Sequence, residues 1–443
     1  MVLSLWFLRV NTGNRDGVAG ALWIAVLWLV LLSSRPLATW MGNDLQVDTL
    51  QDALRGSTVD RRAYVLLMLS ATVVVLRRNI RWQQLVAANK LLVLFYLYFA
   101  VSTLWAEYPL VSMRRLIKDL GSVLIVMIVL SERNRPEALR TLFTRGAWLL
   151  VPVSVVLIRY FPAIGRRYHA FSGHLWSIGV TSHKNALGVL LVVVMLPVLW
   201  DLLHLKEKRP YRMLANGVLL LLATWLLAAA ESATAVACLA LGAAVLIAAR
   251  HASLRPRIVP AAVVAIAAVG VLMGLDSFTS ILDPIVSLLG RDATLTGRTD
   301  VWQALLALEI PPLIGTGFYS FWSDPNYQEQ LPYWIAYSAH NGYIEVYIDG
   351  GLIGLGLLLM VLLAVARRIH TQVQSGESTA VLRAAMLLVV LFYNFSESAF
   401  GRISPIWFAF LLIAIEYPEA EREGGEEVRE LQYPIANKEC PIS

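Results

Sequence analysis

Residues 338–356, SAHNGYIEVYIDGGLIGLG, open with the polar pair His-Asn and run directly into an apolar segment at 343–366. About 18 or more apolar residues in a row are enough for a helix to cross the hydrocarbon core of a bilayer. Glu345 and Asp349 lie four residues apart and therefore share one face of this helix. Because carboxylates in a membrane helix are costly, they usually face a bundle interior or water. The stretch therefore predicts a membrane helix that carries a polar site at one end.

The composition of the whole chain is typical of a polytopic membrane protein. Its 443 residues are 58% hydrophobic and only 15% charged, with a mean hydropathy of +0.63, whereas a soluble domain is nearer half apolar and a quarter charged. Backbone groups in lipid must hydrogen-bond within their own segment, so each apolar run is expected to be a helix. We therefore predict an all-α fold of about 12 transmembrane helices. The predicted spans are 17–34, 63–76, 91–106, 116–130, 146–160, 186–203, 213–230, 232–249, 257–275, 343–366, 380–396 and 403–416.

Lysine and arginine are divided unequally between the two sides of this predicted bundle. With a cytoplasmic N-terminus, the cytoplasmic segments hold 23 of the 37 basic residues, in agreement with the positive-inside rule. Both termini are then cytoplasmic and the long connection faces outward. We attribute the net charge of +6 to this topology and predict no nucleic-acid partner. The chain divides into nine helices at 1–275, an outward loop at 276–342, three helices at 343–416 and an acidic cytoplasmic tail at 417–443.

The outward loop contains an amphipathic helix and a cluster of aromatic residues. In 294–310, TLTGRTDVWQALLALEI, Thr299 or Asp300 can cap a helix that a Pro-Pro pair ends. Arg298 stands just ahead of its N-terminus, where free N–H groups and a guanidinium favour a phosphate. An arginine that contacts only interfacial lipid or solvent fits the pattern equally. The eight aromatic residues between positions 318 and 337 suit a membrane interface, sugar stacking or a lipid tail.

A second basic stretch lies on the predicted outward side, against the charge trend. Residues 161–188, FPAIGRRYHAFSGHLWSIGVTSHKNALG, carry two arginines, three histidines and a lysine. Two interpretations stay open, a solvated loop whose charges the topology tolerates and an anion site.

The junction between the loop and the tenth predicted helix carries a lone histidine. A lone histidine is more often structural than catalytic, but a neutral imidazole at His340 could accept a proton from a hydroxyl group. Further along the same helix, Gly350 and Gly354 form a GxxxG pair, which predicts close helix packing.

Four stretches resemble motifs of the bacterial O-antigen ligases and related polysaccharide polymerases. His340-Asn341, nine residues and then Gly351-Leu-Ile-Gly354 fit the family pattern H-N-x9-G-x-x-G. GRTDVW at 297–302 resembles the family's loop arginine motif, and IGTGF at 314–318 resembles its following glycine turn. GVTSHKNALG at 179–188 is similar to the version in exopolysaccharide polymerases of the succinoglycan type. The twelve predicted spans and the long loop before the tenth also match this family.

The resemblance implies a membrane glycosyltransferase with a GT-C-like fold. Its members use glycans carried on undecaprenyl diphosphate as donors, in the periplasm, with inversion and without a metal or other cofactor. It therefore implies a multi-pass protein of the bacterial inner membrane that polymerises exopolysaccharide repeat units. The implied partners are the lipid-linked oligosaccharide, a glycan acceptor and the lipid bilayer, with a chain-length regulator and a flippase as further candidates.

The resemblance also implies roles for two catalytic residues. His340 would be the general base that takes the proton of the acceptor hydroxyl as this hydroxyl attacks the anomeric carbon. Arg298 would stabilise the negative charge that develops on the leaving diphosphate.

Four more residues are implied at the substrate. Arg167 matches best a second arginine that the family uses before its sixth or seventh helix, and Lys184 is the alternative. Asn341 would orient the sugar or the imidazole, and Glu345 would set the tautomer of the histidine.

Three other functions compete with the polymerase. An O-antigen ligase, which transfers glycan to a lipid A core, shares the His340 and Arg298 patterns. A lipid-linked glycan transporter would also use charges in membrane segments, but the chain shows no convincing internal repeat. A membrane protease is weaker, because no G-x-S-x-G motif occurs, and the lack of a GxxxxGK[ST] loop argues against a nucleotide-binding domain.

Overall fold

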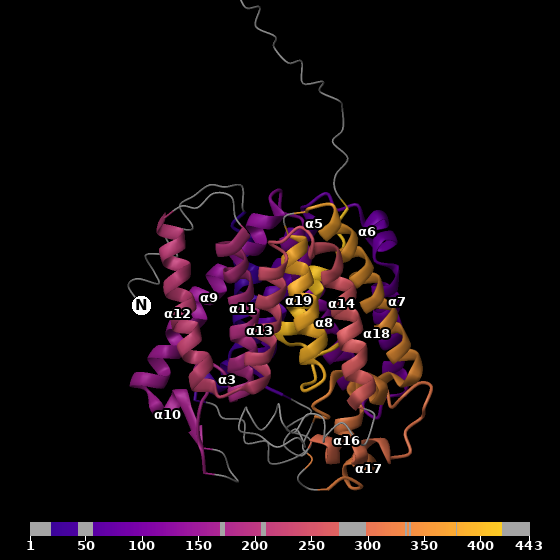
Figure 1. The fold of residues 1–443 in the computed structure, drawn as a ribbon. Helices are drawn as coiled ribbons and strands as arrows, with labels where there is room; N and C mark the ends of the chain where they lie inside the picture. The colour runs from indigo at the N-terminus through magenta and orange to yellow at the C-terminus, as the bar shows by residue number, and fades with distance from the viewer. Residues whose placement is uncertain are drawn as a thin grey trace, which may run out of the picture.

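Each predicted span coincides with a helix in the computed structural model, which forms a bundle of helices lying side by side (Figure 1). The structure describes residues 19–42, 56–168, 173–204, 210–273, 298–332, 335, 338–377 and 379–418. The twelve helices in the predicted spans are α2 (Leu22–Ser33), α5 (Thr58–Leu76), α7 (Lys90–Ser102), α8 (Pro109–Leu130), α9 (Arg135–Tyr160), α11 (Lys184–His204), α12 (Pro210–Ala230), α13 (Ala233–Ala248), α14 (Arg255–Met273), α18 (Gly342–Gln374), α19 (Ala380–Tyr393) and α20 (Pro405–Ala414).

Some helices of this bundle are long enough to cross a bilayer. Among the described residues, four helices are long and apolar enough to cross a membrane, namely Arg135–Tyr160, Lys184–Leu203, Pro210–Ala230 and Gly342–Gln374. A fifth span results if α6 (Trp82–Ala88) and Lys90–Trp105, bent by 89° against each other, count as one. The chain is therefore an all-α, multi-pass membrane protein. Twelve crossings stay a prediction.

The centre of the bundle is built from helices that are apolar on every side. All residues of α20, and all of α19 except Phe392, are buried. A helix that is hydrophobic all round belongs in a protein interior or in lipid. The outer helices instead leave large apolar side chains exposed, such as Leu66 and Leu69 of α5 and Leu97 of α7. These exposed side chains form a surface suited to hydrocarbon.

The two ends of the described chain lie at the same end of the bundle. The Ala19 N–H donates to the carboxylate of Glu132 at 3.0 Å, and the Arg135 guanidinium donates to the carbonyl of Tyr417 at 2.9 Å. The predicted cytoplasmic termini are thus consistent with each other, although the side of the membrane stays a prediction. From residue 419 on, the predicted acidic tail lies outside the described residues.

Short elements gather at the opposite end, at the bottom of Figure 1. They are α10 (Pro162–Gly165), the hairpin of β1 (Arg166–Tyr168) and β2 (Leu175–Ser177), α16 (Arg298–Leu306) and α17 (Pro325–Gln328). They come from the two regions that the sequence predicts to face outward. Residues 276–297 of the predicted loop, His169, and the aromatic residues Tyr333, Trp334 and Tyr337 lie outside the described residues.

In the part of the loop where the sequence predicts an amphipathic helix, the structure has α16. It begins at Arg298 itself, so this arginine lies in the first turn and not ahead of it. Its apolar face, with Trp302 and Leu305, packs into a small core that includes Ile348 of α18. The helix therefore sits over the bundle and is anchored to the helix that follows the loop.

The glycine motifs meet at a break in α18. Gly351 has φ 61° and ψ −161°, which interrupts the helical hydrogen bonds. The freed carbonyls of Ile348 and Asp349 accept the N–H groups of Thr316 and Gly317, each at 2.9 Å. A Cβ atom on Gly351 would lie 2.2 Å from the backbone of the turn at 311–318. The two glycine motifs are therefore one packed unit.

The predicted close packing at the GxxxG pair is also confirmed. A Cβ atom on Gly350 would lie 2.9 Å from the ring of Phe99, and one on Gly354 would lie 3.1 Å from it. The hydroxyl of Tyr98, on the same helix α7, donates to the Gly350 carbonyl at 2.6 Å. The small residues thus let α7 approach the backbone of α18.

Candidate functional site

Three side chains from three separate segments converge at the end of the bundle that carries α16. The Arg298 guanidinium contacts Glu397 Oε1 at 3.0 Å, and His340 Nδ1 lies 3.3 Å from Glu397 Oε2. Arg298 begins α16, His340 precedes α18, and Glu397 lies in the connection between α19 and α20. The structure therefore brings the two predicted catalytic residues onto the two oxygens of one carboxylate.

Glu397 is the residue that the sequence reasoning missed. It follows the predicted span 380–396, in the stretch NFSESAFGRIS at 394–404. An acid at the end of a membrane helix is itself a signal for a functional site, and that signal was present. Its contact partners lie 57 and 99 residues away in sequence, so no local pattern pointed to them.

The carboxylate of Glu397 is held in its charged form. Burial disfavours the charge, but the hydrogen bond from His340 and the charges of Arg298, His340 and His183 outweigh it, so the pKa of Glu397 lies below its usual range. An ionised carboxylate only accepts hydrogen bonds. In a neutral imidazole, the contact with this carboxylate places the proton on Nδ1, which donates to Glu397, and leaves the lone pair of Nε2 free. The His340 side chain is 41% exposed.

The start of α11 supplies a further contact to Glu397. The Asn185 side-chain amide donates to Glu397 Oε1 at 2.8 Å. Beside it, His183 packs edge-on against the Trp176 ring of β2, with centroids 4.7 Å apart. Lys184 Nζ lies 4.9 Å from the centre of the same ring. The motif GVTSHKNALG thus reaches the site through Asn185.

The two predicted substrate cations from this region lie near the cluster. Burial lowers the pKa of His183, and the positive charges of Lys184 and Arg167 together with His340 lower it further, while Glu397 opposes them. Arg167 stands opposite Trp176 in the hairpin and is exposed. Both cations therefore act electrostatically on His183, which in turn acts on Glu397.

The backbone at His340 is strained. Its φ of 48° is a left-handed conformation that few residues other than glycine adopt. Two serines hold it, since the His340 N–H donates to Ser338 Oγ and the Asn341 N–H donates to Ser398 Oγ, each at 3.1 Å. Strain of this kind persists where the surrounding structure fixes it, and it is frequent at functional sites.

Asn341 has a structural task beside this histidine. Its side-chain oxygen accepts the N–H groups of Tyr343 at 3.0 Å and Ile344 at 3.2 Å, so it caps α18. Its side-chain amide donates to the carbonyl of Phe395 at 3.5 Å. These bonds fix the start of α18, and a role of Asn341 in orienting a sugar stays a prediction.

Glu345 is buried and supports the loop in front of His340. Its Oε1 accepts the Ala339 N–H at 2.8 Å, and its Oε2 accepts the Trp322 indole N–H at 2.9 Å. It also forms an ion pair with Arg402. The side chain of Glu345 is 1% exposed, and the carboxylate on the His340 ring is that of Glu397. Glu397, and not Glu345 as predicted, is therefore placed to set the tautomer of His340.

A buried charge network continues below Glu345. Arg402 also contacts Asp349 at 3.2 Å, and its guanidinium lies 4.0 Å from the centre of the Tyr319 ring. Arg115 of α8 lies on this tyrosine too, at 5.1 Å, and donates to its carbonyl. Two arginines and two carboxylates balance each other here. The acidic face of α18 thus faces the bundle interior, as predicted, and its contacts join α18 to the loop.

An apolar groove begins at the site and follows α18. A cavity of about 840 Å³ lies between α14 and α18. Thr299 of α16 and Asn341 line one part of it, and each is the immediate sequence neighbour of a residue in the Arg298–Glu397–His340 cluster. Apart from Gln303 and Tyr343, the rest of the lining is apolar, with Ile266, Leu359 and Leu363 among its residues. The cluster therefore stands at the mouth of a groove suited to hydrocarbon.

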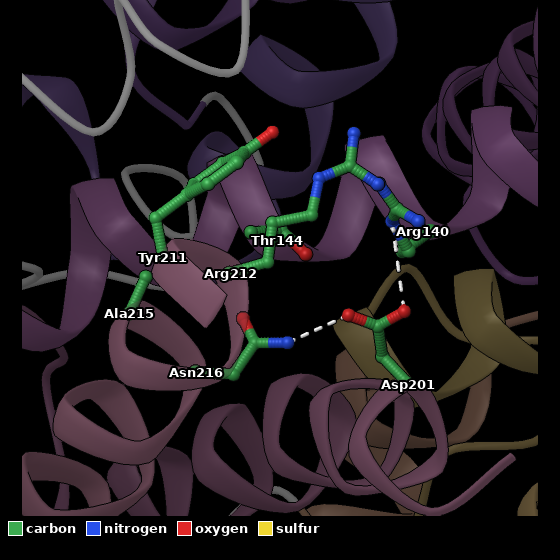
Figure 2. A pocket seen from close by; sticks show the side chains of 7 residues that line it. All are labelled: Arg140, Thr144, Asp201, Tyr211, Arg212, Ala215 and Asn216. Carbon is green, nitrogen blue, oxygen red and sulfur yellow. Dashed lines mark hydrogen bonds and ion pairs between the residues drawn. The ribbon is translucent and has the colours of Figure 1, made fainter. Parts of the chain in front are cut away.

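A second polar pocket lies at the opposite end of the bundle. Figure 2 shows Arg140 of α9 and Asn216 of α12 pointing toward Asp201 of α11, at 3.6 and 2.6 Å. Arg140 also pairs with Glu137 at 2.8 Å. The free space of about 10 Å³ holds no more than one water molecule. This pocket joins three helices and offers no room for a substrate.

The Arg298–Glu397–His340 cluster has the groups for acid–base chemistry on an anionic, lipid-bound molecule. It combines an oriented imidazole, a guanidinium and an apolar groove. Within the described ranges, no three His, Cys, Asp or Glu side chains converge as metal ligands do.

Comparison with known proteins agrees with the motifs. Residues 217–359, from α12 into α18, match the family model described as O-antigen ligase. The exopolysaccharide production protein ExoQ of Rhizobium meliloti (strain 1021) is 29% identical over 317 residues, which cover 67% of this chain and 69% of the relative. The resemblance to the O-antigen ligases and polysaccharide polymerases is therefore confirmed, and the chain is similar to an exopolysaccharide production protein.

Proposed function

We propose that this chain, similar to O-antigen ligases and to an exopolysaccharide production protein, is a membrane glycosyltransferase that polymerises exopolysaccharide repeat units. The donor is a glycan on undecaprenyl diphosphate, and the site faces the periplasm from the bacterial inner membrane. One observation carries the proposal: the Arg298–Glu397–His340 cluster stands at the mouth of an apolar groove. A lipid-linked sugar diphosphate needs this combination of hydrocarbon surface, cation and base.

The groove can hold part of a lipid tail. The α18 residues that line it extend from Tyr343 to Ala366. The lining residues after the break at Gly351 run from Leu355 to Ala366, and at about 1.5 Å per residue this stretch is about 17 Å long, roughly half of the hydrocarbon thickness of about 30 Å. A polyprenyl chain along α14 and α18 would therefore bring its diphosphate to the level of Arg298.

His340 is the general base of this reaction. Its Nδ1–H is held by Glu397, so Nε2 can accept the proton of the acceptor hydroxyl. The hydroxyl oxygen forms the new bond to the anomeric carbon while the bond from that carbon to the diphosphate oxygen breaks. Attack from the face opposite the leaving group inverts the anomeric centre, and the electron pair leaves with undecaprenyl diphosphate.

Arg298 stabilises the leaving group. Its guanidinium presents two parallel N–H donors that fit phosphate oxygens. A cation already placed where negative charge develops lowers the barrier without reorganisation. Arg167 and Lys184 are the candidates for a second cation on the diphosphate, because both act electrostatically on His183, which in turn acts on Glu397.

The experiment that tests the function sizes the lipid-linked glycans of a deletion strain, with and without the wild-type gene. Accumulation of single repeat units on the lipid supports the polymerase. Long polymer stranded on the lipid instead supports an O-antigen ligase, the alternative that the matched family description favours. An unchanged lipid-linked pool contradicts both. Conversion of a lipid-linked oligosaccharide by the purified protein separates both enzymes from a transporter.

A further inference from the structure

The Glu397 carboxylate contacts both Arg298 and His340, which have different proposed roles. Oε1 accepts from Arg298 at 3.0 Å and from Asn185 at 2.8 Å, and Oε2 accepts from His340 at 3.3 Å. The side chain of Glu397 is 13% exposed, so these contacts, and not solvent, determine where its charge acts. Arg298, the proposed donor cation, and His340, the proposed base, are therefore coupled through the Glu397 carboxylate.

A diphosphate at Arg298 competes with this carboxylate. This step rests on the proposed function, which brings the donor diphosphate to Arg298. Bidentate contact with a phosphate uses the guanidinium fork that now points at Glu397 Oε1. Asn185 stays on Oε1 as a neutral donor, so the carboxylate keeps a hydrogen bond when the arginine leaves.

We propose that the donor diphosphate takes Arg298 from Glu397, and that the released carboxylate then strengthens His340 as a base. Glu397 is thus a positioning residue whose action depends on donor occupancy. An anionic partner that is no longer neutralised by an arginine favours the protonated imidazole, by about 1 pH unit or more in the protonation midpoint. The base gains strength only when the donor is in place.

The other charges around the cluster do not replace this link. His183 acts electrostatically on Glu397, while Lys184 at the start of α11 and Arg167 in the hairpin act on His183. None of them is an anion, so none can take the place of Glu397 beside the imidazole. Glu397 is the carboxylate that the structure places on the His340 ring.

Coupling of this kind is reciprocal. If a diphosphate raises the protonation midpoint of His340 by about 1 unit, protonation of His340 raises the affinity for the diphosphate about tenfold. The donor would therefore be held more tightly after the proton transfer begins, when its charge is greatest.

The test measures the protonation midpoint of His340 by histidine NMR on the full chain in lipid nanodiscs, with and without inorganic pyrophosphate. In the wild type, pyrophosphate should raise the midpoint by about 1 pH unit more than in Glu397→Gln, where only its own charge acts. In Arg298→Gln the midpoint should be high already and should not respond. His251, exposed at the opposite end of the bundle, serves as the internal reference.

The wild type alone also decides, because a His340 midpoint that does not respond to pyrophosphate overturns the exchange whether or not the variants fold. The affinity for pyrophosphate should rise about tenfold as pH falls through the His340 midpoint, beyond the change seen with Glu397→Gln. Equal responses in wild type and Glu397→Gln, or no response, overturn the exchange. Normal transfer activity with that result leaves the proposed function intact. A clear exchange in a protein without any transfer activity contradicts the function alone.

Discussion

The Glu345 carboxylate accepts the backbone N–H of Ala339, the residue before His340, at 2.8 Å. The same carboxylate binds the Trp322 indole and pairs with Arg402. A single buried acid therefore fixes the loop that presents the histidine, and it does so from the first turn of α18. Glu345 therefore bears on the position of His340 and does not contact its ring.

Glu345→Gln should destabilise the protein strongly. It removes one of the two carboxylates on buried Arg402 and leaves part of that charge uncompensated, at a cost of about 3 kcal/mol in the free energy of unfolding. Thermal denaturation of the purified protein in detergent measures the loss. The matched control is Glu309→Gln, an exposed carboxylate just after α16, which should change stability by no more than about 0.5 kcal/mol. Equal melting temperatures for the two variants would contradict the buried role.

His340→Asn should separate chemistry from folding. Asparagine tolerates the left-handed backbone at this position but cannot act as a base near neutral pH. Transfer should fall by about 10²–10⁴-fold, the usual contribution of general base catalysis, while the amount of inserted protein stays the same. The readout is the size of the lipid-linked glycans, with His251→Asn as the control. Normal polymer output from a stably inserted His340→Asn protein would rule out the general base.

The transfer rates of Arg298→Lys and Arg298→Gln should separate the charge of the guanidinium from its two parallel N–H donors. Lysine keeps the charge but loses the fork, so its rate should lie between the wild type and glutamine. For Arg298→Gln we expect a loss of about 10²–10³-fold in kcat, typical of removing one group that stabilises developing charge. Single-turnover transfer from a lipid-linked donor measures both. If Arg298→Lys keeps the full wild-type rate, the fork is not needed.

The helices were predictable because lipid leaves the chain few options. Apolar runs show directly in the sequence, and in hydrocarbon they must become helices. The four-residue spacing of acidic residues along one helix was also readable, as the shared inward face of Glu345 and Asp349 shows. The contact partners of these polar residues could not be predicted. The partners of Glu345 are Trp322 and Arg402, 23 and 57 residues away, and no local period encodes such distances.

The same limit applies to the site. His340 and Arg298 were found from their motifs, but the carboxylate between them lies in a third segment that joins two other helices. Glu397 stood just beyond the predicted span 380–396, and helix packing alone decides that this connection reaches the loop. Asn341 shows the converse, since a capping residue before an apolar helix is a local signal.

The stability conferred by Glu397 should depend on pH with a definite sign. Its pKa is lower in the folded protein than the ordinary value of 4.5. The stabilisation is therefore complete above about pH 5 and is lost as pH falls through the folded pKa. Melting temperatures of the wild type and Glu397→Gln should differ most near neutral pH and converge as the pH falls below the ordinary carboxyl pKa and through the lower folded pKa of Glu397. A difference that stays constant, or grows in acid, would contradict the ionised carboxylate.

Filling the groove should selectively weaken the binding of donors with long lipid tails. Leu359 lines the cavity between α14 and α18 and is 44% exposed. Leu359→Trp should raise KM for a full-length polyprenyl diphosphate donor about tenfold, because overpacking of a fitted site costs about 1–3 kcal/mol. A donor with a short prenyl chain, which ends before this position, should keep its KM. The control is Leu66→Trp, on the exposed face of α5 and away from the groove. If both donors lose affinity equally, or if Leu66→Trp has the same effect, the tail does not lie along α18.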